Sequence, residues 1–272
     1  MVRIIALAAL LLAPLAAAPQ ATPPSDSPPQ SDAPPALPPL ARPAVLIVST
    51  TTGFRHDSIA EAVPAIERLA KARGWGSFAT ENAAIFHPAA LAKFDVIVFA
   101  NATGDFHTPA RRAAFRAFLA RGGGFVGLHS AGDDSHPDWF VTLRGNGRFT
   151  GHPGGGDQFQ AADIRVADRT HPATRHLPTR WHWTDEYYSW DAPPAADAHV
   201  LARLDEAGMR IEPKLRMGGD HALIWWRCAG RARIFYSALG HRAEAWADPD
   251  HLKMVGGAIG WAARAEGAGC DA

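Results

Sequence analysis

Short runs of consecutive apolar residues punctuate the first half of the chain. Residues 44–48, 94–99 (interrupted by Asp95) and 125–128 form three such runs, which are typical of strands buried on both faces of a sheet. Longer segments with helix signals separate them. This alternation of strand and helix predicts a mostly parallel central sheet with helices on both faces, so we expect an α/β fold.

Two helices are predicted between these strands. Ser58 and Glu61 have the spacing of a capping box, so a helix is expected to start there and to end near Arg73, before a glycine. Thr108 followed by proline is typical of a second helix start. Apolar residues at helical spacing follow it and precede the glycine run at 122–124.

The second half has a weaker pattern. A short helix is expected at 139–143 and a last helix from Asp248–Pro249, and strands are expected at 159–166, 199–204, 222–228 and 233–237. Residues 145–156 contain six glycines, so we expect a loop with unusual backbone angles or a close approach to a ligand.

The N-terminus has a different composition. Residues 1–18 combine an early arginine, a short apolar run and small residues, which predicts a secretory signal peptide. Residues 19–43 are rich in proline, alanine, serine and glutamine and predict a disordered linker. We therefore expect one domain at 44–264, a C-terminal tail at 265–272, and an exported mature chain without a membrane span, in the periplasm or outside the cell.

Charge and cysteine content narrow the function classes. Lysine plus arginine equals aspartate plus glutamate, at 27 each. The sequence has no basic stripe of the kind that would indicate nucleic-acid binding. The only cysteines are Cys228 and Cys270. In an exported protein they could form a disulfide, but Cys228 lies in a mostly apolar run and could equally be a buried free thiol.

The strongest candidate for chemistry is His129. It follows a predicted strand in the turn Gly127–Ala131, whose spacing resembles the elbow that presents a nucleophile in many α/β enzymes. Ligands bind at the carboxyl ends of strands in open α/β sheets, and an imidazole there can act as acid, base or metal ligand. Ser130 is one position past the apex, which disfavours a serine hydrolase.

Other polar residues follow strands at the same expected edge. Arg55 and His56 come after the first strand, and Asn101 and Asp105 after the second. These are hydrogen-bonding and charged groups suited to a hydroxyl-rich or anionic ligand, so we predict that all four bind substrate. Each segment could also be an ordinary polar turn.

Two carboxylates complete the predicted acid–base machinery. Asp133 lies just past the elbow, where it could orient His129, and Glu186 lies among aromatic residues that could raise its pKa. Trp183 and Tyr187 flank Glu186, and flat apolar faces beside carboxylates suit a sugar, although tryptophan more often packs in a core.

Histidines distant in sequence could also form a metal site. His152 lies in the glycine-rich loop and His241 follows another predicted strand. Together with His129 they could bind a divalent metal such as zinc. No closely spaced ligand motif such as His-Glu-x-x-His is present, so this prediction depends on the fold bringing the three together.

Seven segments, in order, resemble the trehalose-utilisation (ThuA-like) family: 53–59, 101–105, 122–131, 151–153, 171–174, 185–187 and 235–241. The resemblance implies a flavodoxin-like sandwich similar to class I glutamine amidotransferases. Those enzymes have cysteine at the elbow, whereas this chain has His129, so glutamine hydrolysis is excluded. Asp220-His221-Ala222 also departs from the Asp-His-Pro that relatives often carry, so the turn there could differ.

The family is associated with breakdown of trehalose and related disaccharides, and some members act together with sugar oxidoreductases on 3-keto sugars. The resemblance therefore implies a small-molecule sugar substrate and a sugar oxidoreductase as a candidate partner. The leading hypothesis is an exported enzyme that cleaves or isomerises a sugar with His129 and Glu186. The alternative is a non-catalytic carbohydrate-binding module, and the chain could be a homo-oligomer in either case.

Overall fold

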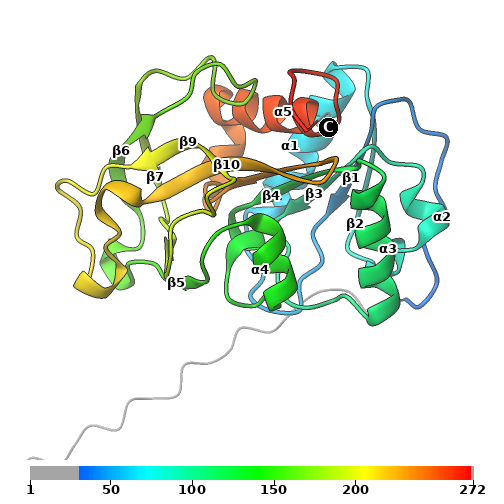
Figure 1. The fold of residues 1–272 in the computed structure, drawn as a ribbon, viewed down its shortest axis with the longest axis horizontal. Coiled ribbons are helices and arrows are strands. Elements are labelled where there is room, and N and C mark those ends of the chain that lie inside the picture. The colour runs from blue at the N-terminus through cyan, green and yellow to red at the C-terminus, as the bar shows by residue number, and fades with distance from the viewer. Residues whose placement is uncertain (1–30, 271–272) are drawn as a thin grey trace, which may run out of the picture.

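The predicted buried runs all become strands of one sheet in the computed structural model, which describes residues 31–270 (Figure 1). The parallel part of the sheet has the order β2-β1-β3-β4-β11. Its strands are β1 (Ala44–Val48), β2 (Gly76–Thr80), β3 (Val96–Ala100), β4 (Gly124–Leu128) and β11 (Ala232–Ser237). This is a flavodoxin-like strand order, which confirms the predicted fold class.

The other part of the sheet is antiparallel. It continues from β11 in the order β10-β9-β6-β7. These strands are β6 (Gln160–Val166), β7 (Arg180–Asp185), β9 (His199–Leu204) and β10 (Ala222–Ala229). No crossover helix connects them, and antiparallel pairing needs none. Two short strands, β5 (Phe149–Gly151) and β8 (Ser189–Trp190), form a separate antiparallel pair.

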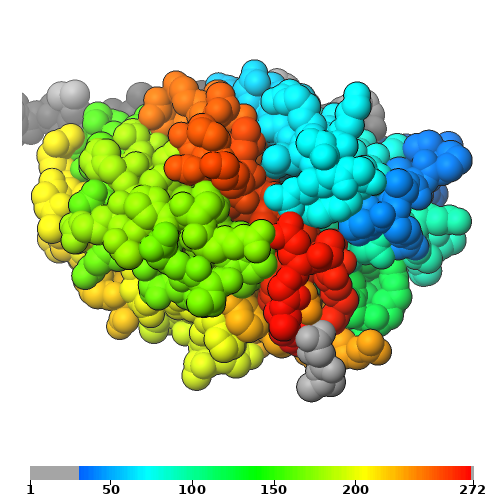
Figure 2. Space-filling model, turned by 90° about the horizontal axis from the view of Figure 1, so that it is seen from above, coloured from blue at the N-terminus to red at the C-terminus, as the bar shows by residue number. Residues whose placement is uncertain are grey.

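Helices cover both faces of the parallel part, as the alternation predicted. Figure 1 shows α1 (Ile59–Ala72) and α5 (Pro249–Ala262) on one side, and α3 (Pro109–Ala120) and α4 (Asp138–Arg144) on the other, with the one-turn α2 (Pro88–Leu91) beside α3. Figure 2 shows α1 and α5 side by side although they lie at opposite ends of the domain sequence. Packing of these helices buries the strands, and every residue of β1, β3, β4 and β11 is buried.

The start of α1 differs from the capping-box prediction. Ser58 precedes the helix, but its hydroxyl makes no capping hydrogen bond. The hydroxyl instead donates to the Gly240 carbonyl (3.3 Å) and accepts from the Asn101 side chain (2.8 Å). The helix therefore starts where it was predicted, but the predicted capping hydrogen bond is absent because a tertiary contact uses the same hydroxyl. At α3 the predicted cap is confirmed, since the Thr108 hydroxyl accepts from Arg111 N (3.3 Å).

Both ends of the domain pack against it. Residues 31–43 lie within the predicted linker and form no helix, yet Leu37 and Leu40 contact the core. The C-terminal tail, red in Figure 2, is joined to β10 by a Cys228–Cys270 disulfide. The predicted signal peptide lies outside the described residues. Within them, no helix combines the length and the apolar character needed to span a bilayer.

Candidate functional site

The predicted elbow is present at the end of β4. His129 has a φ of 44°, a left-handed conformation that is rare outside glycine, and a 3₁₀ turn (His129–Gly132) follows it. The Tyr236 hydroxyl donates to the His129 carbonyl (2.7 Å). A Cβ at Gly132 would lie 2.0 Å from that hydroxyl oxygen, so glycine is required for the contact. The strained turn fixes the position of the His129 ring.

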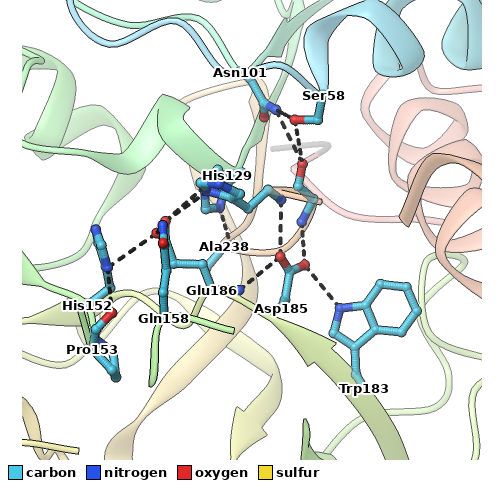
Figure 3. Close-up of polar contacts among 12 residues, drawn as sticks. Ser58, Asn101, His129, His152, Pro153, Gln158, Trp183, Asp185, Glu186 and Ala238 are labelled. Carbon is cyan, nitrogen blue, oxygen red and sulfur yellow. Dashed lines mark hydrogen bonds and ion pairs between the residues drawn. The ribbon is translucent and has the colours of Figure 1, made fainter. Parts of the chain in front are cut away.

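Three imidazoles and one carboxylate, those of His56, His129, His241 and Glu186, meet beside this turn. Figure 3 shows His129 and Glu186 side by side. His129 Nδ1 bonds to the Ala238 carbonyl (2.9 Å), and because a carbonyl only accepts, this nitrogen carries a proton. Nε2 lies 3.0 Å from His241 Nδ1 and 3.3 Å from Glu186 Oε2. The His56 ring packs edge-on against the His129 and His241 rings.

Asp185 holds the second half of this arrangement in place. Its carboxylate is fully buried and accepts hydrogen bonds from Gly240 N (2.8 Å) and His241 N (3.2 Å). It also accepts from the Trp183 indole (3.0 Å) and from the adjacent Glu186 N (Figure 3). Asp185 therefore joins the turn after β11 to the end of β7, and so fixes Glu186 relative to His241.

Burial and charge set the protonation of the group. Burial, together with the neighbouring His129 and His241, lowers the pKa of His56 to about 2. Burial also opposes the charged form of His129, but hydrogen bonding to and attraction by Glu186 outweigh it and raise the pKa of His129. Burial likewise opposes ionisation of Glu186, yet the bonds to His129 and His241 hold its pKa well below the usual range. The cluster thus contains an ionised, buried carboxylate and a neutral His56.

A cavity of about 350 Å³ opens above this group. The cavity is lined by ten residues: Phe54, His56, Asp133, Asp134, Phe149, His152, Gln158, Glu186, Tyr188 and His241. The size falls within the range of small-molecule sites. A larger groove of about 600 Å³ lies beside α1 and β2, but its walls carry no comparable cluster of imidazoles and carboxylates. We therefore take the smaller cavity as the candidate site.

The structure brings most of the predicted catalytic and metal-binding residues to this cavity. His129 lies fully buried beneath it, and Glu186 forms its floor. His152 Nδ1 lies 3.2 Å from Glu186 Oε1, on the side away from His129. Asp133 lines the cavity, and burial raises its pKa to about 6.

Most of the predicted substrate-binding residues do not line the cavity. Only His56 of this set does so. Arg55 pairs with Glu81 (2.8 Å) at another groove, and Asp105 lies 3.7 Å from Arg112. Three others are buried beneath the site, where they bond to the protein itself: Asn101, Trp183 and Tyr187.

Five lining residues were not among the predicted site residues: Phe54, Asp134, Phe149, Gln158 and Tyr188. Gln158 donates to Glu186 Oε1 (2.6 Å), and the Tyr188 ring packs on His129 with 4.4 Å between ring centroids. Phe54 adjoins the predicted Arg55–His56 pair and Tyr188 adjoins Tyr187. The predicted residues therefore lie next to Phe54 and Tyr188 in the chain, but the sequence does not determine which of two adjacent side chains faces the cavity.

The donor set fits a divalent transition metal. One ligand atom from each of His56, His129, Glu186 and His241 lies within 4.8 Å of all the others. His56 Nδ1 is buried and has no hydrogen-bond partner. The Nδ1–H of His129 donates to a backbone carbonyl, the usual second contact of a metal-binding histidine. This group shares His129 and His241 with the predicted set, with His56 and Glu186 in place of His152.

Comparisons with known proteins agree with this fold. A ThuA-like protein from Bacteroides uniformis is 25% identical, with a TM-score of 0.68 over 85% of this chain and 93% of its own. A second, from Parabacteroides merdae, is 18% identical, with a TM-score of 0.60 over 82% and 90%. PurLQS from Thermotoga maritima, at 13% identity and a TM-score of 0.51 over 81% and 99%, is similar in fold alone.

No curated protein sequence matches the chain significantly. The family model for ThuA, described as trehalose utilisation, matches residues 44–262, which is nearly the whole folded domain. The chain therefore belongs to the ThuA family, whose description is trehalose utilisation.

Proposed function

We propose that this chain is an exported, metal-dependent enzyme that cleaves or isomerises a carbonyl-containing sugar, with 3-keto-glycosides as the substrate class. The observation that carries the proposal is the group His56, His129, Glu186 and His241 at the base of an open cavity. Its donor types suit zinc or a similar divalent ion. A ThuA family description of trehalose utilisation supports a sugar as the ligand.

A divalent ion bound by these four residues would polarise a sugar carbonyl or hydroxyl oxygen. The charge and the contacts of Glu186 support metal binding by this cluster. Glu186 supplies a negative charge, and Gln158 and His152 contact its second oxygen and so orient it. His129 has no exposed surface, so in our proposal it is a ligand rather than the base that contacts substrate.

Proton transfer is assigned to Asp133 and His152, which both line the cavity. In a 3-keto-glycoside the carbonyl acidifies the neighbouring C2–H bond. The His152 imidazole would take that proton, the C1–O bond would break to leave an enone, and the Asp133 carboxyl would protonate the departing oxygen. A carboxyl with a pKa of about 6 is matched to proton transfer near neutral pH.

Metal analysis of untagged protein tests the first part of the proposal. We expect roughly one divalent ion per chain after incubation with zinc, and much less in Glu186→Gln and His241→Ala. His182→Ala is the matched control, because His182 is exposed and lies outside the cluster. Wild-type protein that retains no zinc, manganese, iron or cobalt would contradict the proposal.

Incubation with 3-keto-trehalose tests the second part. Product sugars are followed by NMR for the wild type, Asp133→Asn and His152→Ala, each with and without added metal. We expect turnover by the wild type and strongly reduced turnover by both variants with unchanged metal content. If the wild type does not act on this substrate under either condition, 3-keto-trehalose is removed from the substrate class.

The alternative is a carbohydrate-binding module without catalysis. It is favoured by one observation, the number of aromatic rings around the cavity. Calorimetry with disaccharides distinguishes the two functions. Binding that survives Asp133→Asn and His152→Ala, in a protein that turns over no keto sugar, favours the module.

Export and a partner are also part of the proposal. The N-terminal signal pattern and the Cys228–Cys270 disulfide both support an oxidising compartment. Fractionation of expressing cells, with N-terminal sequencing of the mature chain, tests this. A 3-keto sugar must be supplied by an oxidoreductase that oxidises a C3 hydroxyl, so we propose such an enzyme as the partner in the reaction sequence.

A further inference from the structure

Two large apolar side chains are exposed among residues 31–270, and both lie beside the imidazole cluster. Phe54 is 50% exposed and Phe159 is 43% exposed. The Phe54 ring lies 4.9 Å from the His56 ring, and the Phe159 ring lies 5.1 Å from the His241 ring. Because the His56 and His241 rings also touch each other, with 4.8 Å between their centroids, ring contacts connect all four side chains.

The backbone under Phe54 is held by the protein. The Thr103 hydroxyl donates to the Phe54 carbonyl (2.9 Å). The adjoining segment pairs with the loop after β3, where Thr52 N donates to the Thr103 carbonyl (2.9 Å). A Cβ at Gly53 would lie 3.3 Å from Ser135 Cβ, which is a tight contact. Exposure of this ring is therefore a feature of a packed turn.

Phe159 is held in the same way from both sides. The preceding Gln158 donates to Glu186 Oε1 (2.6 Å), and the following Gln160 bonds to the backbone of Arg210 through both its amide atoms. The Arg242 guanidinium lies 5.9 Å from the ring centroid and covers part of it. Two anchored glutamines thus present one exposed aromatic ring at the edge of the cavity.

No tryptophan among the described residues lines the cavity. Trp183, predicted as a sugar platform, is buried and stacks on His251 with 5.5 Å between centroids. Isolated exposed apolar residues are common, but two fixed rings that both contact the same polar cluster are a built feature. A flat apolar ring next to hydrogen-bonding groups is the surface that the CH face of a sugar ring matches.

We propose that Phe54 and Phe159 bind the second ring of a disaccharide, while its first ring occupies the cavity above Glu186. This inference rests on the proposed function and adds the residues that select a two-ring glycoside over a single sugar. The Phe54 and Phe159 faces contact the departing sugar, so they set affinity and leave proton transfer unchanged. They are specificity residues rather than catalytic residues.

Calorimetry on metal-loaded protein with trehalose and with glucose tests the proposal. The wild type is expected to bind trehalose more tightly than glucose. Phe54→Leu and Phe159→Leu keep apolar volume but lose the flat face, and each should weaken trehalose binding about fivefold. Neither should change glucose binding. Phe54→Tyr and Phe159→Tyr should retain trehalose binding, because the ring remains.

Phe78→Leu, on the distant strand β2, is the control for the exchange itself. Thermal unfolding checks that each variant folds, and half-exposed positions should tolerate the change. Equal binding of the two sugars by the wild type, including no measurable binding of either, overturns the inference, as does trehalose binding that neither leucine variant weakens. Because binding is measured without turnover, ring-dependent binding of trehalose by a protein that does not act on 3-keto-trehalose would contradict the proposed reaction and leave this inference standing.

Discussion

Asp133 is a buried carboxyl whose titration should make the stability of this protein depend on pH. Burial is the largest influence and raises its pKa, and the negative charge of Asp134 acts in the same direction. The Ser135 hydroxyl and N–H donate to the carboxylate, and His129 attracts it, which opposes the rise. The net pKa is about 6, compared with 3.8 in an unfolded chain.

The direction of the effect follows from proton binding. Below about pH 4 the carboxyl is protonated in both the folded and the unfolded state, so it does not change stability. Between about pH 4 and 6 the unfolded chain releases this proton while the fold retains it, so the free energy of unfolding decreases as pH rises. Above pH 6 both states are ionised, and about 3 kcal/mol of stability has been lost.

Asp133→Asn removes this titration. The free energy of unfolding of the variant, relative to the wild type, should therefore increase by about 2 kcal/mol between roughly pH 4.5 and 7.5. Urea unfolding at several pH values measures the difference, with a chelator present so that bound metal does not contribute. The exposed Asp57→Asn is the control for exchanging aspartate for asparagine at the surface.

The pH-dependent difference is the informative quantity, because asparagine also changes the contacts with Ser135 at every pH. If wild type and Asp133→Asn differ by the same amount across the whole range, the carboxyl is not held in its protonated form by the fold. That result would also remove the basis for assigning Asp133 as the proton donor in the reaction.

Three further predictions concern the framework of the site. Replacing Cys228 and Cys270 with serine should lower the free energy of unfolding by about 4 kcal/mol, because the disulfide links residues 42 apart; urea unfolding measures this, and no loss would contradict it. Gly132→Ala should cost about 1–3 kcal/mol in thermal unfolding, since the new Cβ meets the Tyr236 hydroxyl, and adding Tyr236→Phe should recover part of the loss. Asn101 has a φ of 53°, so Asn101→Gly should have a free energy of unfolding about 1 kcal/mol higher than Asn101→Ala, as measured by urea unfolding. The reverse order would show that backbone strain is unimportant there.

The sheet could be predicted where burial is complete. Residues 44–48 are apolar throughout because β1 is covered on both faces, and the predicted and observed bounds coincide. Strand β2 (Gly76–Thr80) escaped prediction because it lies at the sheet edge, is only half buried, and has a single large apolar residue. Strand β7 does alternate buried and exposed residues, but its tryptophans were interpreted as a ligand surface instead of one face of a strand.

The site could be predicted only as far as the strand ends determine it. His56, His129 and His241 each follow a parallel strand, so the rule that strand ends share one edge placed them together. Which of two adjacent residues faces the cavity depends on local backbone geometry. Arg55 and Tyr187 were therefore predicted at the site, whereas the structure places Phe54 and Tyr188 along it.

Glu186 shows why the antiparallel strands matter to the chemistry. The imidazoles of His56, His129 and His241 come from the flavodoxin-like half of the sheet. A cysteine at the elbow would not require a buried carboxylate beside it. The carboxylate reaches them from the end of β7, at the far edge of the sheet, and Asp185 bonds that end to the turn carrying His241. A buried carboxylate is costly unless it is paired, and these histidines provide the pairing. The added strands and the histidine at the elbow are therefore parts of one arrangement, since each leaves buried polar groups unsatisfied without the other.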